Sequence, residues 1–331
     1  MTQTSIYISR ISSSQKDYNF YFREAISNIS EGKYLFYDDL SSIKADHNAC
    51  LIVNWPEEVL SWNVNDERVK SAISSLNQLK NDGLKIMYIW HNSRPHHTDN
   101  GKRALYEFIQ SNASLTVHLN NHSLNWAKTR SLSAQKKLIR HPFMYNGFPE
   151  VQGDGLLIYG RLRHRKEILL AITTLFVCSV LRRHVYLGSF PKSTGHSLKL
   201  IFRLLKKNKF IHLNDGILKG QLEMEFWGNC KTVLSPRSGQ QCNSGILING
   251  ISEKRRFIVG DIGSAADYNI SNVVFRFKNI LHLIYNLIMD TNLPYEKALF
   301  STDEFVKIEK ESSAQSFENG LRNALSILTD A

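Results

Sequence analysis

The chain has 331 residues, and its 41 lysines and arginines outnumber its 30 aspartates and glutamates, which gives a formal net charge of +11. Hydrophobic residues make up 42% of the sequence and charged residues 21%, with only 7 prolines, a composition that excludes a disordered chain. The surplus of positive charge favours a polyanionic partner, which is nucleic acid, an anionic membrane surface or a phosphorylated small molecule.

Short apolar runs alternate with helical patterns along the whole chain. The runs that we predict as strands are the region of Leu35 and residues 49–53, 85–90, 114–118, 156–159, 184–187, 232–234 and 257–260. Such alternation is typical of parallel sheets covered by helices on both faces, whose functional loops gather at the carboxyl ends of the strands. We therefore predict an α/β protein with two doubly wound, Rossmann-like domains that face each other across a cleft.

A polar stretch with several glycines and a proline, from Asn146 to Gly155, separates the two halves. Residues of these types interrupt regular secondary structure and are typical of linkers. The sequence thus predicts an N-terminal domain of residues 1–148 and a C-terminal domain of residues 149–331, with the option that the last helix packs back on the N-terminal domain.

Two predicted strands of the N-terminal half lead into loops that carry reactive side chains. Trp55 and Glu57 follow the first strand as an aromatic platform and a carboxylate; the alternatives are core packing for Trp55 and an ordinary helix start for Glu57. His91 follows the second strand, where it can form hydrogen bonds or transfer a proton, or merely cap the loop. His96 and His97 lie in the same loop, but no carboxylate accompanies them, so a metal site is not favoured.

In the C-terminal half, a cluster of cations follows the strand 156–159 and opens a predicted helix. The cluster consists of Arg161, Arg163, Arg165 and Lys166. Cations at a helix start oppose the helix dipole and therefore invite an anion, and guanidinium groups can donate paired hydrogen bonds to a diphosphate. A solvated basic turn is an equally strong alternative.

Asn243, Ser244 and Gly245 lie between the strand 232–234 and a helical pattern over 246–251. Unpaired backbone N–H groups and the positive end of the helix dipole converge at such a start, which makes it an anion site. An ordinary capped helix start is the alternative. Because this loop and the basic loop both follow strands of one domain, we predict a single pyrophosphate site built from the two.

A basic amphipathic pattern covers residues 198–210. Its apolar residues keep helical spacing while its cations fall mostly elsewhere. A solvated face of a sheet-covering helix is the favoured explanation, and a surface for a membrane or an acidic partner is the minority one.

The cysteines and the start of the chain bear on the compartment. Cys50, Cys178, Cys230 and Cys242 lie far apart and form no Cys/His metal spacing, which predicts free thiols in a reducing compartment and no metal site. The N-terminal residues lack the apolar core of a signal peptide, and the longest apolar run, residues 168–181, is shorter than the ~20 residues that cross a bilayer. We expect a cytoplasmic protein, with peripheral attachment at the inner face of the cell membrane as an option.

In their order along the chain, these loops resemble motifs of the bacterial GT-B glycosyltransferases that build surface polysaccharides from nucleotide sugars. The matching positions are Asn19 and Tyr21 near the first helix, Asn54 to Glu57, His91 to His96, residues 160–166, Asn243 to Gly245, and Asp261 with Gly263. The His-Asn-x-x-Pro-His loop of that family is intact at residues 91–96. The similarity covers most of the chain.

The resemblance implies transfer of a sugar from a nucleotide-diphosphate sugar to a saccharide acceptor, in the leading version a lipid-linked one, during capsule, O-antigen or exopolysaccharide biosynthesis. The implied donor-diphosphate residues are Arg161, Arg163, Lys166, Asn243, Ser244 and Gly245. The implied catalytic residues are His91 and Glu57, and the implied acceptor-binding residues are Asn19, Tyr21, Trp55 and His96. The nucleotide sugar is a co-substrate, and no further cofactor or metal is implied.

The sequence departs from the family beside the donor helix. Many relatives carry glutamates where this chain has Cys242 and Gly250, although Glu253 lies near enough in sequence to substitute, and Glu167 replaces the last glycine of the basic loop motif. A catalytically degenerate GT-B-like binding or scaffold protein is therefore the alternative function. Nucleic acid is a weaker alternative that we do not predict, because aromatic residues do not interleave with the basic segments.

Overall fold

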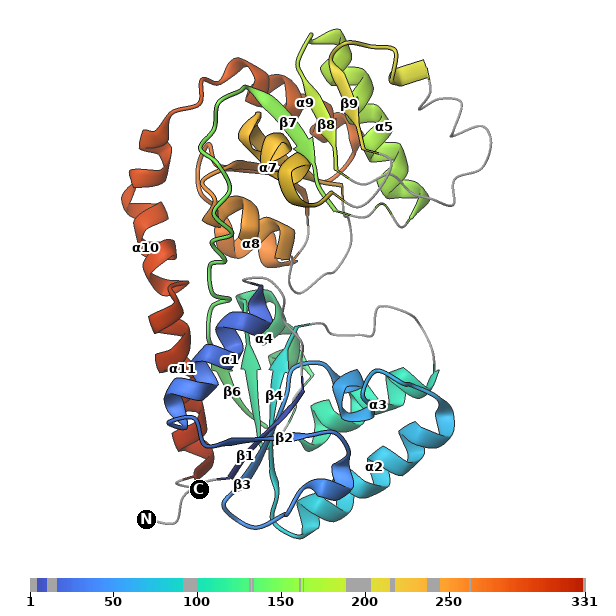
Figure 1. The fold of residues 1–331 in the computed structure, drawn as a ribbon, viewed down its shortest axis with the longest axis vertical. Helices are drawn as coiled ribbons and strands as arrows, with labels where there is room; N and C mark the ends of the chain where they lie inside the picture. Colours follow the sequence, from blue (N-terminus) through green and yellow to red (C-terminus); the bar gives the residue numbers. More distant parts are fainter. Residues whose placement is uncertain are drawn as a thin grey trace. The chain divides into compact units, whose positions relative to one another are not determined.

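The computed structural model describes residues 5–10, 17–91, 100–130, 132, 134–160, 162, 164–188, 204–214, 218–236, 245–261 and 263–329. The chain divides into two compact units (Figure 1): the first combines Met1–Pro142 with Lys310–Ala331, and the second is Phe143–Glu309. This division lies a few residues before the boundary that the sequence predicts after residue 148, and it assigns the C-terminal segment to the first unit.

The first unit contains a six-stranded parallel sheet with the strand order β2-β1-β3-β4-β5-β6. The strands are β1 (Ser5–Ser9), β2 (Tyr34–Tyr37), β3 (Ala49–Val53), β4 (Lys85–Trp90), β5 (Leu115–His118) and β6 (Gln135–Leu138). The helices are α1 (Tyr18–Ile29), α2 (Asp66–Asn81), α3 (Asn100–Asn112), α4 (Asn121–Thr129) and α11 (Ala314–Thr329), with short 3-10 helices η1 (Leu40–Ser42) and η2 (Pro56–Leu60). The chain passes from the second unit to the first within α10 (Asp303–Glu311).

The second unit has the same plan, with the strand order β12-β11-β10-β7-β8-β9 in a six-stranded parallel sheet. The strands are β7 (Gly155–Ile158), β8 (Val185–Leu187), β9 (Ile211–Leu213), β10 (Cys230–Ser235), β11 (Arg256–Gly260) and β12 (Val274–Phe277). The helices are α5 (Arg165–Val180), α7 (Gly220–Gly228), α8 (Gly245–Ser252) and α9 (Ile280–Asn292), with η3 (Gly263–Tyr268) and η4 (Lys297–Ser301).

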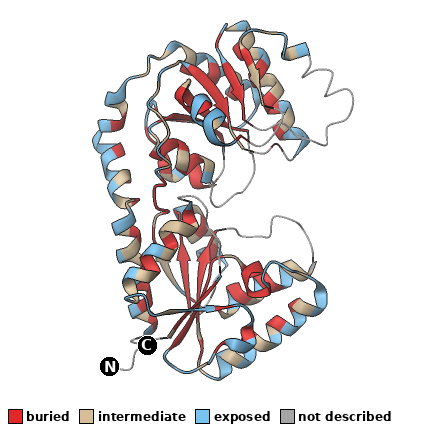
Figure 2. Cartoon of the chain, in the orientation of Figure 1, coloured by how far each residue is buried: buried red, intermediate tan, exposed pale blue. Residues whose placement is uncertain are grey.

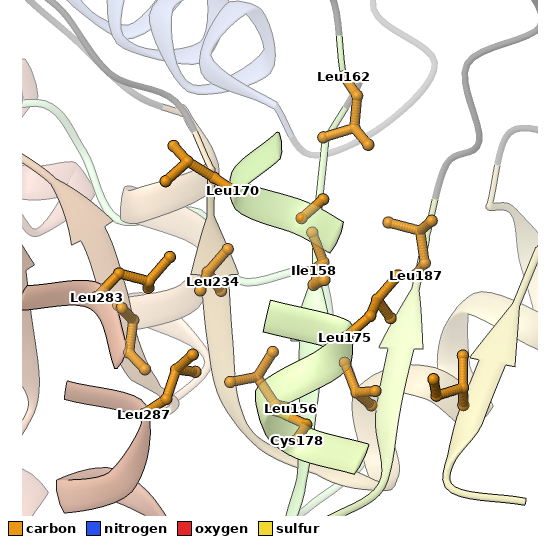
Figure 3. Close-up of a cluster of buried hydrophobic side chains, with 14 of the residues drawn as sticks. Leu156, Ile158, Leu162, Leu170, Leu175, Cys178, Leu187, Leu234, Leu283 and Leu287 are labelled. Atoms are coloured by element: carbon orange, nitrogen blue, oxygen red, sulfur yellow. The ribbon is translucent and has the colours of Figure 1, made fainter. Parts of the chain in front are cut away.

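The central strands are buried along their whole length, as the red arrows of Figure 2 show. Strands covered on both faces are continuous apolar runs rather than alternating ones, which is why the sequence identifies them readily. In the second unit the core gathers around Leu156 and Ile158 of β7 and Leu234 of β10 (Figure 3). All paired strands run parallel, because each helical connection returns the chain to the start of the next strand.

The predicted α/β class and every predicted strand are confirmed. The strands that the sequence did not reveal are β1, β6, β9 and β12. Three of these, β6, β9 and β12, are edge strands. They are only partly buried, and polar or charged side chains interrupt them, Lys136 and Lys137 in β6, His212 in β9 and Arg276 in β12, so they lack the continuous apolar run on which the prediction depends.

The C-terminal helix α11 joins the first unit through its apolar face. Phe317 and Leu321 are buried at helical spacing, and the Phe317 ring lies 5.9 Å from the ring of Tyr18 in α1. The Asn28 amide donates to Glu318 Oε2 at 2.9 Å. These contacts explain why a segment that follows the second unit in sequence folds with the first.

Two further expectations concern membranes. Residues 198–203 of the predicted basic helix 198–210 lie outside the described residues, and only Leu204 and Leu205 of the described residues 204–210 are helical. Within the described ranges, no helix combines the length and the apolar composition that crossing a bilayer demands.

Candidate functional site

Side chains from three elements meet at the carboxyl edge of the first sheet. Trp55 follows β3 and His91 follows β4, and these strands are neighbours. Tyr18 opens α1, the helix that follows β1 on the other side of β3. Because neighbouring parallel strands end at one edge, the topology alone brings the three residues together.

The three rings pack closely. The His91 imidazole stacks on the Trp55 indole with ring centroids 4.3 Å apart and an angle of 17° between the planes. The Tyr18 ring meets His91 edge-on at 4.4 Å, and its hydroxyl donates to Asn54 Oδ1 at 3.1 Å. Trp55 keeps part of its surface exposed while His91 is buried. The indole therefore supports the imidazole and remains partly accessible to solvent.

Burial holds the pKa of His91 well below its usual value, and the neighbouring His141 adds to the effect. Burial also lowers the pKa of His141 to about 4, although its Nδ1–H donates to the Pro142 carbonyl oxygen at 2.9 Å. At neutral pH His91 is therefore an uncharged imidazole that can donate one hydrogen bond and accept another.

Glu57 and Glu58 are both buried in η2. Glu57 Oε2 accepts a hydrogen bond from the Tyr106 hydroxyl of α3 at 3.0 Å, and Glu58 Oε2 accepts one from the Asn54 backbone N–H at 3.3 Å. Burial raises the pKa of Glu58 to about 7, and the charge of Glu57 adds to this, while nearby hydrogen-bond donors oppose it. Glu58 is therefore the carboxyl group of this site that titrates near neutral pH.

Sequence reasoning singled out Glu57 and missed Glu58, Tyr18 and His141. For Glu58 a signal existed, since a carboxyl group close to a buried strand and beside a second carboxylate is expected to have a raised pKa through burial and like charge. Tyr18 and His141 carry no motif. Their roles appear only when α1 and the end of β6 are placed at the same sheet edge.

The remaining predicted acceptor residues lie close to this cluster in sequence or outside the described residues. Asn19 and Tyr21 are in the first turn of α1, and both are half-buried. Asn19 Oδ1 is buried and accepts no hydrogen bond from the described part of the chain, whereas the Tyr21 ring packs edge-on against Phe20 at 5.4 Å. His96 lies outside the described residues.

In the second unit, the two predicted phosphate-binding segments start side by side. β7 and β10 are neighbouring strands that pair Ile158 with Leu234. Gly160, which follows β7, has a φ of +102°, and a Cβ atom there would lie 2.4 Å from Ile246 Cδ1 in the first turn of α8. Glycine is needed here for both its backbone conformation and its size. The basic loop and the helix start are thus in contact.

Gly245 is the first residue of α8, and a Cβ atom added there would meet no atom within 4 Å. Lys166 is exposed in the first turn of α5. Leu162, in the loop between Gly160 and α5, is buried in the core. Arg161, Arg163, Asn243 and Ser244 lie outside the described residues. The described part of the site is therefore a helix start together with two exposed cations, Arg165 and Lys166, of the basic cluster.

Glu167 stands where the basic-loop motif of GT-B glycosyltransferases has its last glycine. Its carboxylate folds back onto the start of its own helix. Its side chain is buried, and Oε2 accepts a hydrogen bond from the His164 backbone N–H at 3.2 Å. This bond satisfies a donor at the start of α5 and is a capping interaction. The carboxylate is therefore part of the helix start.

Of the two positions at which the resemblance implies glutamates, the structure describes Gly250, and this position is used for packing. Gly250 lies inside α8, where a Cβ atom would come within 2.4 Å of Phe257 Cδ2 on β11, so a longer side chain does not fit. Glu253 follows the last residue of α8, at the opposite end of the helix from Gly245, and its Oε1 accepts from the backbone N–H groups of Asn146 and Gly147. Glu253 therefore holds the start of the second unit through Oε1. Cys242 lies outside the described residues.

In the ranges that the structure describes, no three His, Cys, Asp or Glu side chains come together in a way that could hold a metal ion. Cys50, Cys178 and Cys230 are buried free thiols. Burial raises the pKa of Cys50 and Cys178 to about 12, so these thiols remain protonated and unreactive.

The sequence matches no protein-family model and no curated protein. The fold, in contrast, is similar to solved structures. The Anabaena protein Alr3699/HepE, solved in complex with UDP and glucose, matches with a TM-score of 0.67 and 10% identity over 98% of this chain and 99% of that one. The UDP-forming α,α-trehalose-phosphate synthase of Burkholderia vietnamiensis matches with a TM-score of 0.56 and 10% identity, over 93% of this chain and 79% of that one.

Staphylococcus aureus TarM, in a structure with fondaparinux, alpha-GlcNAc-glycerol and UDP, matches with a TM-score of 0.61 and 14% identity over 86% of this chain. The match covers 57% of that TarM chain, so this protein spans little more than half of TarM. At these identities the likeness concerns the fold. The chain has the two-sheet α/β architecture of these proteins, which is the GT-B fold.

Proposed function

We propose that the protein transfers a sugar from a nucleotide-diphosphate sugar, bound by the second unit, to a saccharide acceptor bound by the first. The observation that carries this proposal is the contact between Gly160 and Ile246, which joins a basic loop to an open helix start at one sheet edge. Three proteins of similar fold were solved with UDP or are UDP-forming, which supports a uridine nucleotide as the first donor to test.

The donor site supplies the charge that the reaction needs. As the glycosidic bond breaks, negative charge builds on the leaving diphosphate, and preorganised cations and helix N–H groups stabilise it. We assign this role to Lys166 and Gly245, together with Arg161, Arg163, Asn243 and Ser244. The chemistry of these groups neutralises the leaving group without a metal ion.

On the acceptor side, we assign the neutral imidazole of His91 to a hydrogen bond with the transferred sugar or with a reacting oxygen atom. Its stacking on Trp55 fixes the ring plane, and a fixed ring loses little entropy on binding. Trp55, Asn19, Tyr21 and His96 would shape the acceptor site. Glu57 remains a proposed catalytic residue. Because its carboxylate already accepts a hydrogen bond from Tyr106, we propose that it acts through the adjacent Glu58 rather than by direct contact with a substrate.

We further propose a lipid-linked saccharide as the acceptor, in capsule, O-antigen or exopolysaccharide synthesis at the inner face of the cell membrane. The surplus of positive charge supports attachment to anionic lipid.

Calorimetry with UDP-sugars and the double variant Arg161→Ala, Lys166→Ala tests the donor assignment. Each lost charge-assisted hydrogen bond is worth ~2 kcal/mol, so we expect donor affinity to fall by at least ~30-fold while thermal unfolding is unchanged. The control is Lys307→Ala, an exposed lysine of α10, which should bind like the wild type. Unchanged donor affinity in the double variant would refute the assignment.

A catalytically degenerate binding protein is the second candidate. It is favoured by the absence of a carboxylate at Gly250 and by the engagement of Glu253 with the backbone of Asn146 and Gly147. Binding of a nucleotide sugar without hydrolysis or transfer, in a screen that includes saccharide and lipid-linked acceptors, would support this candidate over the enzyme.

A further inference from the structure

An apolar surface covers the outer side of α5 and α9 in the second unit. The two helices pack on the same face of the sheet and contact each other. Figure 3 shows that the buried sides of the helices send Leu170 and Leu175 from α5, and Leu283 and Leu287 from α9, toward the strands. The opposite sides are exposed, although they carry large apolar residues.

These outward residues form one stripe on each helix. They are Leu169, Phe176 and Val180 on α5, and Ile280, Leu281, Tyr285, Ile288 and Met289 on α9. Residues spaced by three, four or seven positions share a helix face, so each set lies opposite the buried side of its helix. We call this surface the α5–α9 apolar face.

The exposure of this face is large. Leu281 is 77% exposed, Val180 66% and Phe176 63%. Half of the exposed large hydrophobic side chains in the described ranges belong to the face. Scattered exposed hydrophobic residues are ordinary, but a contiguous set on two adjacent helices marks an interaction surface.

Neither helix exposes a carboxylate. α5 contains one acid, Glu167, which is buried and caps the helix. α9 contains one acid, Asp290, which is fully buried and pairs with Arg183 at 2.6 Å and Arg256 at 3.4 Å. The surface that the two helices offer to a partner therefore carries no negative charge.

Exposed cations lie at both ends of the face. Arg165 and Lys278 lie where the helices begin, and Arg182 lies just beyond the end of α5. Lys207 is also exposed, and its neighbour Asn208 donates a hydrogen bond to Ser179 Oγ of α5, which ties this basic segment to the same helix end. An apolar face with a cationic rim is complementary to an anionic lipid surface, whose headgroups attract cations and whose acyl region accepts apolar side chains.

We propose that the α5–α9 apolar face docks on an anionic lipid bilayer. A second copy of this chain is the less suitable partner, because a self-complementary contact would bring the cationic rims together. Nucleic acid would use the cations but leave the apolar side chains exposed. The proposal names the surface for the membrane attachment proposed above, and it does not depend on sugar transfer, since vesicle binding is measured without any substrate.

Sedimentation of the full chain with phosphatidylcholine vesicles, with and without about one-third phosphatidylglycerol, tests the proposal. We expect strong partition onto the anionic vesicles and at least tenfold weaker partition onto the neutral ones, because each cation near the surface contributes ~1 kcal/mol. The double variant Phe176→Ser, Leu281→Ser should lose at least ~tenfold in partition onto anionic vesicles, since it removes two side chains that would enter the bilayer. The double variant Arg182→Gln, Lys207→Gln should lose ~fivefold or more and should respond less to salt.

The matched control is Leu222→Ser, Met224→Ser, which removes two exposed apolar side chains of α7 in the same unit and should bind vesicles like the wild type. Circular dichroism confirms that each variant is folded. The proposal is overturned if the wild type ignores anionic vesicles, or if the Phe176/Leu281 variant binds them as well as the control. It is also overturned if the wild type is a dimer that this variant converts to a monomer with no change in vesicle binding.

Discussion

At the scale of single residues, burial sets the charge of the candidate site in the first unit. His91 and His141 are held neutral, and the pKa of Glu58 is raised to about 7. A site of this kind uses hydrogen bonds rather than fixed charges to address a neutral sugar. The positive charges that the proposed transfer requires belong to the other unit, at Lys166 and the neighbouring basic loop.

The His91→Ala variant should therefore affect turnover more than donor binding. A positioned hydrogen-bonding or proton-transferring group contributes ~100-fold or more, so we expect kcat to fall by about that factor while the Kd for the nucleotide sugar stays within twofold. Steady-state kinetics and calorimetry on the same preparation measure both quantities. His91→Asn, which keeps a hydrogen-bonding side chain, should retain more activity than His91→Ala; equal and unimpaired kinetics in both variants would remove His91 from the site.

Glu58 makes a separate prediction for stability against pH. Its folded-state pKa of about 7 is raised above the unfolded value, so its contribution to stability is fully present below about pH 4 and is lost as pH rises through 7. Glu58→Gln removes this dependence. Relative to the wild type, the variant should thus gain up to ~3 kcal/mol in the free energy of unfolding between pH 4 and pH 8.

Urea unfolding at several pH values measures this difference, and Glu24→Gln, an exposed position of α1, is the control. The buried histidines act in the opposite direction in both proteins, because their lowered pKa values cost stability as pH falls below about 6.5. They therefore cancel in the comparison. A constant difference between Glu58→Gln and the wild type across this range would show that Glu58 is not perturbed.

At the scale of elements, the two glycines of α8 differ in the space around them. A Cβ atom at Gly245 would meet no atom of the described residues within 4 Å, whereas Gly250 packs against Phe257 on β11. The first leaves room for a ligand at the helix start. The second lets the helix approach the sheet and leaves no room for the carboxylate that the resemblance to GT-B glycosyltransferases implies at this position.

Gly250→Ala should therefore destabilise the protein, although alanine favours helix by ~1 kcal/mol over glycine. A Cβ atom 2.4 Å from the Phe257 ring forces a shift in a packed core, which costs ~1–3 kcal/mol. Gly245→Ala, in the same helix, is the matched control and should leave stability unchanged or slightly raised. Denaturant unfolding of the two variants decides the matter, and equal stabilities would contradict the close approach of α8 to β11.

The same scale shows how far the sequence predicts this structure. Continuous apolar runs identified the central strands, and loops after them correctly indicated that Trp55 and His91 share one edge. The edge strands β6, β9 and β12 lack that signal because they are short, only partly buried and interrupted by polar or charged side chains. The roles of Tyr18 and His141 depend on contacts between elements far apart in sequence, which periodicity does not encode.

At the scale of the whole molecule, each unit is a six-stranded parallel sheet with its candidate groups at the carboxyl edge. The aromatic and imidazole groups of the candidate site belong to the first unit, and the groups that we propose to bind the diphosphate belong to the second. This separation suits a reaction with two substrates of different chemistry, a charged nucleotide sugar and a neutral saccharide. The fold alone supports many chemistries, so the assignment depends on these groups.

The most direct test of the account is release of nucleoside diphosphate by the purified chain from a panel of nucleotide sugars, UDP-sugars first, with saccharide acceptors present. We predict that one donor yields diphosphate together with an extended acceptor, and that Arg161→Ala, Lys166→Ala abolishes both. A wild-type protein that binds a nucleotide sugar but releases no diphosphate with any acceptor would contradict transfer and leave a binding protein. A protein that binds no nucleotide sugar would contradict the donor site itself.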